Sequence, residues 1–112
     1  MITLSKREKK IAREIIEKGL QIEYANALNE AFNDLQKWKD KKTDTRETYH
    51  NLFGTVRKND KHIARRYDGM RGSDYVYVIA AQLLDGIISD DDLKEFGEQT
   101  QKSIRRMRDI YK

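Results

Sequence analysis

The first third of the chain has the pattern of one uninterrupted helix, from Ser5 to about Lys39. At about 1.5 Å per residue such a helix is roughly 50 Å long, whereas a compact domain of this size is only about 35 Å across. The helix is therefore longer than any core that a chain of 112 residues can build. Its apolar side chains need cover from another molecule, and we expect a second copy of the chain to supply it.

This first helix opens with a capping pattern, because Ser5 and Glu8 can each accept a hydrogen bond from the other's backbone amide. Apolar residues then recur mostly at spacings of three and four, as on one face of a helix. They are Ile11, Ala12, Ile15, Ile16, Leu20, Tyr24, Leu28, Ala31, Phe32, Leu35 and Trp38. Gly19 disfavours helix, and we interpret it as a point of close approach by another helix.

A second helix is expected to start at Asp44 or Thr45 and to end near Tyr67. Its apolar face consists of Tyr49, Leu52, Phe53, Val56, Ile63 and Tyr67, with His50 at one edge. Asp60 falls within this face, and a carboxylate there needs a partner or a hydrated interface. Aromatic rings mixed with polar groups are typical of protein interfaces, and this face is one candidate for such a surface; an ordinary intramolecular core is the other.

Helix and strand patterns compete only in the segment 73–85. Its β-branched and aromatic residues suit a strand, but no second strand is available and a single strand is not stable. We therefore expect a buried helix that ends at Gly86. The last helix is expected to start at Ser89, with three aspartates at its positive end. Its inner face comprises Leu93, Phe96, Thr100, Ile104, Met107 and Tyr111. The predicted fold is all-α, with four helices in a single domain of residues 1–112.

Composition and motifs argue against several classes of function. The chain has no cysteine, so disulfides and thiolate chemistry are absent. Its longest apolar run, Tyr75–Ala81, is too short to cross a membrane, and the N-terminal segment lacks a signal-peptide pattern, so we expect a cytoplasmic protein. His50 and His62 lie too far apart on one helix to share a metal ion. We expect no enzymatic activity, no cofactor and no membrane partner.

A net charge of +4 allows a different function, that of a small nucleic-acid-associated protein using the basic stretches of the second and fourth helices. Acidic residues interrupt most of these stretches, which favours solvated helix surfaces and makes nucleic acid the alternative partner. The two functions differ in salt dependence, since phosphate binding weakens steeply with salt. A small, charged, cysteine-free chain also suits a phage- or plasmid-borne regulator or inhibitor.

Several segments, taken in order, resemble a known family. They are Ser5–Arg13, Leu20–Tyr24, Ile63–Asp68, Ala81–Leu93 and Ser103–Arg106. Together they extend over nearly the whole chain, and in this order they are similar to segments of the fluorescence recovery protein family. The resemblance implies an all-α fold with a long two-helix stem (about residues 5–68), a small two-helix head (about residues 73–111) and dimerisation through the stem.

Cyanobacterial members of that family bind the photoactivated orange carotenoid protein and accelerate its return to the resting form. They are accessory proteins without enzymatic activity or cofactor, and the resemblance implies the same for this chain, with that partner or a different protein. In those members, the middle of the second helix carries a tryptophan, a histidine and an acid–arginine pair. The corresponding positions here are His50, Phe53, Gly54 and Asp60.

We therefore predict a homodimer that also binds another protein, with the interface in the middle of the second helix. The residues predicted there are Tyr49, His50, Leu52, Phe53, Val56 and Asp60. By the resemblance, Val78 and Lys102 would lie near a second contact region in the head.

Overall fold

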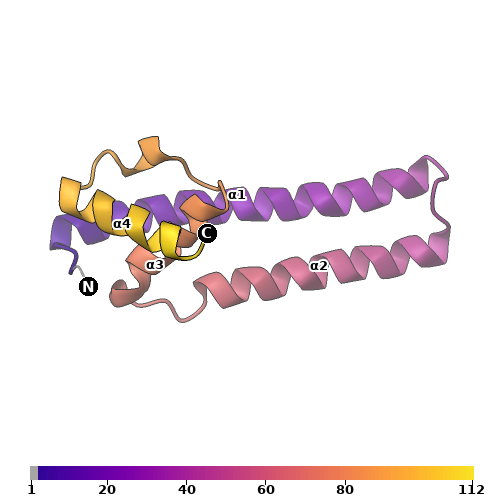
Figure 1. The fold of residues 1–112 in the computed structure, drawn as a ribbon. Coiled ribbons are helices and arrows are strands. Elements are labelled where there is room, and N and C mark those ends of the chain that lie inside the picture. Colours follow the sequence, from indigo (N-terminus) through magenta and orange to yellow (C-terminus); the bar gives the residue numbers. More distant parts are fainter. Residues whose placement is uncertain (1–2) are drawn as a thin grey trace. The chain divides into compact units, whose positions relative to one another are not determined.

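The structure is a computed structural model that describes residues 3–112. It confirms an all-α fold with four α-helices in the order long, long, short and medium (Figure 1). The helices are α1 (Lys6–Lys39), α2 (Thr45–Tyr67), α3 (Tyr75–Leu84) and α4 (Glu98–Ile110). Two short 3₁₀ turns, Gly72–Asp74 and Asp90–Leu93, precede α3 and α4, and none of the described residues forms a strand.

Both long helices start where capping side chains satisfy free backbone amides. Ser5 Oγ accepts from the Glu8 amide at 3.1 Å, and Asp44 Oδ1 accepts from the Glu47 amide at 2.7 Å. The carboxylate of Glu8 has a different role from the one expected, because it accepts from the backbone amide of Gly97 at 3.1 Å. The predicted starts of α1 and α2 are thus correct, and α1 is also tied to the segment that precedes α4.

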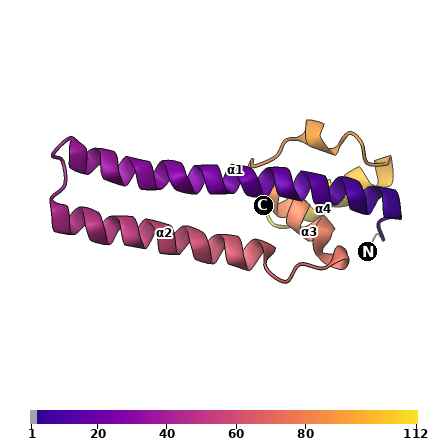
Figure 2. The same cartoon turned by 180° about the vertical axis from the view of Figure 1, so that it is seen from behind.

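The chain divides into two compact units, and α1 contributes to both. The hairpin unit comprises residues 22–68, in which the second half of α1 and the whole of α2 run antiparallel and side by side (Figures 1 and 2). The α3–α4 unit comprises the chain up to Gln21 together with Gly69–Lys112. Nearly all buried apolar side chains belong to the α3–α4 unit: Leu4, Ile11, Ala12, Ile15, Ile16, Val76, Val78, Ile79, Ala80, Leu83, Ile88, Leu93, Phe96 and Ile104.

The segment with competing patterns forms helix α3, as predicted. Val76, Ile79 and Ala80 are buried in the core of the α3–α4 unit, so their apolar character reflects burial and not strand pairing. Gly86 follows the helix with φ of +70°, and its amide donates to the Leu83 carbonyl at 3.1 Å. This left-handed residue ends the helix in the way the sequence predicts.

The predicted start of the last helix is wrong. Ser89 caps only the 3₁₀ turn Asp90–Leu93, and α4 begins at Glu98 after a non-helical stretch. Contacts from the distant α1 explain the break. Lys18 Nζ lies 2.5 Å from Asp92 Oδ1, and Glu8 holds the Gly97 amide. The hydrogen bond from Lys18, joined by one from the Ser89 amide, lowers the pKa of Asp92.

Gly19 allows the close approach that the sequence indicates. A Cβ atom at this position would lie 2.1 Å from Nε2 of Gln82, a side chain with no exposed surface. That Nε2 donates to the Ile16 carbonyl at 3.1 Å, so the amide group of Gln82 sits directly against the backbone of α1. Glycine is required here because any larger side chain would displace a buried polar group.

We expect Gly19→Ala to lower the free energy of unfolding by about 1–3 kcal/mol, since overpacking outweighs the better helix propensity of alanine. Gly54→Ala is the matched control, because Gly54 also lies within a helix but has no atom within 4 Å of its added Cβ. The control should gain about 0.5–1 kcal/mol from propensity alone. Urea denaturation of both variants measures the difference, and equal effects would contradict the role assigned to Gly19.

Candidate functional site

The two helices of the hairpin unit meet through polar side chains. The carboxylate of Glu23 on α1 is buried and is contacted by three side chains of α2. His62 Nε2 and Arg66 Nη1 lie 2.7 and 3.1 Å from Glu23 Oε1, and the Tyr67 hydroxyl donates to Oε2. A buried carboxylate without partners is strongly unfavourable, so these contacts fix α2 against α1 at this end of the hairpin.

Further polar contacts continue toward the turn. Lys58 Nζ and Asn59 Nδ2 donate to Glu30 at 3.1 and 3.3 Å, Thr55 Oγ1 donates to Asp34 at 2.5 Å, and Trp38 Nε1 donates to Thr45 Oγ1 at 3.1 Å. The hydrogen bonds from Lys58 and Asn59 lower the pKa of Glu30 below its usual value. The facing sides of α1 and α2 are therefore polar over much of their length.

The hairpin unit has almost no apolar core. Among residues 22–68, all of which the structure describes, only Glu23, Thr48 and Tyr67 are buried. Tyr67 is the single hydrophobic residue of these three. Burial of apolar surface is the main force that stabilises helix pairs in water, and here that contribution is small within the unit.

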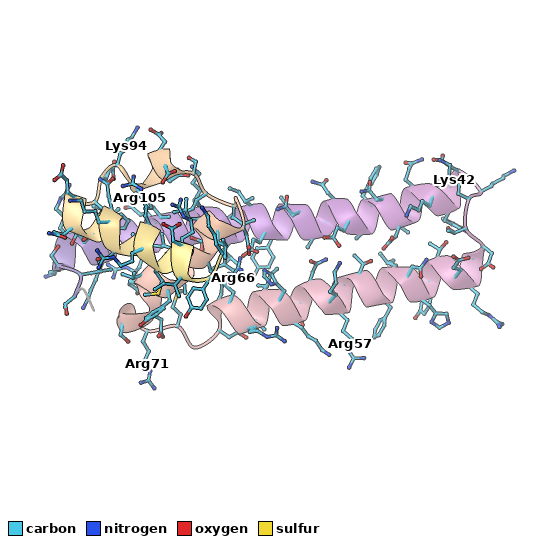
Figure 3. All side chains as sticks on the ribbon, in the orientation of Figure 1. Lys42, Arg57, Arg66, Arg71, Lys94 and Arg105 are labelled. Carbon is cyan, nitrogen blue, oxygen red and sulfur yellow. The ribbon has the colours of Figure 1, made fainter. Side chains whose placement is uncertain are left out.

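The large apolar side chains of the hairpin are instead exposed to solvent. Leu28 and Tyr49 are each 71% exposed, and Phe53 is 61% exposed. We call the whole set the apolar face: Tyr24, Leu28, Phe32, Leu35 and Trp38 from α1, and Tyr49, Phe53 and Val56 from α2. Charged side chains such as Arg57, which projects from α2 away from α1, flank it (Figure 3).

Both halves of the apolar face lie on the same side of the hairpin. On α1, the exposed Tyr24 comes one position after the bridging Glu23. On α2, the exposed Val56 likewise comes one position after the bridging Thr55. One position is a rotation of about 100° about the helix axis. In each helix, the apolar row is therefore rotated by about 100°, in the same sense along the chain, from the side that faces the other helix. Because the two helices run in opposite directions, this rotation places both apolar rows on the same side of the hairpin.

Three of the predicted interface residues, Tyr49, Phe53 and Val56, belong to the apolar face. His50 is exposed beside it, and its ring meets that of Tyr49 edge-on with centroids 5.8 Å apart. Asp60 is also exposed, so its carboxylate lies in water and not among buried side chains. Leu52 is only partly exposed.

The other two predicted site residues lie in the α3–α4 unit. Val78 is buried within α3 and has little surface to offer a partner, whereas Lys102 is exposed on α4. The predicted site also lacks the α1 half of the apolar face. Tyr24, Leu28 and Phe32 belong to the apolar row seen in the sequence, but the row alone does not indicate which of its members are covered.

Other kinds of site receive no support from the described residues. Within 3–112, no group of three or more His, Asp or Glu side chains could hold a metal ion. None of the helices that the structure describes combines the length and apolar character needed to cross a membrane. Among the described residues, eight of the ten large hydrophobic side chains that are exposed belong to the apolar face.

A scan against protein-family models finds no match, and comparisons with curated proteins and with solved structures find none either.

Proposed function

We propose that this protein is a non-enzymatic, homodimeric protein-binding protein whose hairpin unit forms the dimer interface. The observation that supports this proposal is the apolar face, exposed on a hairpin whose own helices meet through polar contacts. A helix pair without an apolar core needs an external apolar surface to bury against. A second copy of the chain carries a surface of the required kind.

The size of the apolar face suits a stable interface. Five of its eight members are aromatic, and an aromatic side chain can bury about 150–250 Å². With roughly half of each ring exposed, the aromatic residues alone offer on the order of 500 Å² of apolar surface. That is near the upper end for the largest patch on a monomeric protein, about 300–600 Å², before the leucines and valine are added.

The arrangement of the apolar face allows a second copy of the chain to be the partner. The two antiparallel helices are related by an approximate twofold axis normal to the face, so the face repeats after a half-turn. An interface between two identical subunits uses the same surface on both, with residue i contacting j and j contacting i, and the apolar face can serve as that surface on each copy. Two hairpins packed face to face would form a four-helix bundle with the exposed aromatic and leucine side chains inside.

Sedimentation velocity of the wild-type protein tests the dimer. We expect a species of twice the mass of the 13.3 kDa chain at micromolar concentration. A species with the mass of one chain at several hundred micromolar would overturn the proposal, because the apolar face would then remain exposed in solution.

We further propose, from the resemblance to the fluorescence recovery protein family, that the dimer regulates another protein. The named candidate is the photoactivated orange carotenoid protein. We expect added dimer to accelerate the recovery of its resting absorbance several-fold at equimolar concentration. An unchanged recovery rate would contradict this partner while leaving the sedimentation result, and hence the dimer, unaffected.

A further inference from the structure

The α3–α4 unit has a groove that lies outside the hairpin interface. Its volume is about 360 Å³, and it opens between the start of α3 and the second half of α4. The α4 wall comprises Ser103, Arg106, Met107 and Ile110, spaced as on one face of a helix over about 10 Å. Val76 and Tyr77 of α3 form the opposite wall. The side chains of Val76, Met107 and Ile110 give the groove an apolar lining.

Arg106 is the charged residue that lines this groove, and Lys102 lines a depression beside it. Arg106 and Lys102 form no ion pair and no side-chain hydrogen bond with any described residue. The neighbouring arginines, in contrast, are ion-paired: Arg105 Nε lies 3.0 Å from Asp90, and Arg108 Nε lies 3.1 Å from Asp109. This second, shallower depression shares Arg106 and Ile110 with the groove and is also lined by Arg105 and Asp109, both of which are already ion-paired.

We propose that this groove binds an acidic, amphipathic segment of a partner protein. An apolar side chain of the segment would enter between Val76 and Met107, and a carboxylate would reach Arg106. Charge complementarity favours an acidic occupant, because neither Arg106 in the groove nor Lys102 beside it has a carboxylate partner among the described residues. Short amphipathic helices commonly bind to apolar grooves in this way, with anchors spaced three or four residues apart.

Two other kinds of ligand fit the groove less well. Small-molecule sites bury about 70–90% of the ligand, whereas this groove is open along one side and would leave much of a small molecule in water. Nucleic acid requires several phosphate contacts from Lys and Arg, but Arg106 is the one cation that lines the groove, and Lys102 adds a second in the adjoining depression. A peptide segment uses both the apolar lining and the isolated charges.

Selection from a displayed library of random 12-residue peptides tests this proposal on the intact protein. We expect the selected peptides to combine Leu, Ile or Phe with Asp and Glu. In fluorescence anisotropy, a synthetic copy of the best peptide should bind Arg106→Glu at least about tenfold more weakly than wild type. Arg106→Lys should retain part of the affinity. Arg106 is an exposed residue, and circular dichroism will verify that each variant is folded.

Lys94→Glu is the matched control, because it makes the same change of charge at a residue outside the groove. Lys94 lies in the stretch between Asp90–Leu93 and α4, and its side chain is 70% exposed (Figure 3). Its affinity for the peptide should change less than about twofold. Selection without acidic amphipathic peptides, or equal binding by Arg106→Glu and wild type, would overturn the proposal. Tighter binding of a 20-nucleotide single-stranded RNA than of any selected peptide would overturn it as well.

Peptide binding in the groove and dimerisation through the hairpin depend on different residues. The binding measurement depends on residues of the α3–α4 unit only, and sedimentation depends on the apolar face. If the peptide-binding experiment contradicts the groove, the sedimentation experiment still tests the dimer, and the reverse is also true.

Discussion

The double variant Leu28→Glu and Phe53→Glu is expected to be a folded monomer at concentrations where the wild-type protein is a dimer. Each substitution places a carboxylate in the middle of the apolar face, one on α1 and one on α2. A dimer would then have to bury four carboxylates without cationic partners, and each costs several kcal/mol. We expect the dimer dissociation constant to rise at least about 1,000-fold, which is about 4 kcal/mol.

Sedimentation velocity over a concentration series measures this change, with circular dichroism to verify helix content. Asn33→Glu with Asn51→Glu is the matched control, because it also adds one glutamate to each helix. Both asparagines are exposed and lie outside the apolar face, so the control should remain a dimer. Equal dissociation of both double variants would show that added negative charge, and not the apolar face, controls assembly.

Truncation of Ile104 to alanine is expected to cost about 3 kcal/mol of unfolding free energy. Ile104 lies on α4 and has no exposed surface, in a core formed with α3 and the first part of α1. Removal of its three outer carbons would lose apolar burial and leave a cavity that the neighbouring side chains fill only partly. Because the α3–α4 unit contains nearly all of the buried apolar residues, this loss is a large share of the total stability.

Ile110→Ala is the control for this measurement. It makes the same chemical change on the same helix, but Ile110 is 68% exposed and its loss should cost less than about 0.5 kcal/mol. Urea denaturation at one fixed protein concentration should be used for both variants, since assembly adds to the apparent stability of a dimer. Similar costs for the two variants would contradict the location of the core in the α3–α4 unit.

Local signals in the sequence were sufficient to locate most helix ends. Ser5 and Asp44 cap α1 and α2 where the sequence predicts, and Gly86 ends α3 with the left-handed conformation expected of it. These features depend on residues within one turn of each other. The start of α4 could not be found in this way. Contacts made by Glu8 and Lys18, some 75–90 residues earlier in the chain, hold the segment after Ser89 out of an α-helix.

The sequence also could not show which part of a long apolar row is covered. Ile11 and Leu28 have the same helical spacing, yet Ile11 is buried in the α3–α4 unit and Leu28 is exposed on the hairpin. Burial depends on which surface lies opposite, and periodicity contains no information about that surface. For the same reason, the sequence predicted only the α2 residues of the apolar face. The α1 residues could be assigned to it only from the structure, in which Glu23 of α1 contacts His62 and Tyr67 of the antiparallel α2.

The hydrogen bond between the Trp38 indole and Thr45 has a practical consequence for spectroscopy. Trp38 is the only tryptophan in the chain, and it lies within the hairpin unit. Its intrinsic emission therefore reports on the region near the turn without any label, whereas far-ultraviolet dichroism reports on all four helices. A denaturation experiment that records both signals will distinguish loss of the hairpin from loss of the α3–α4 core.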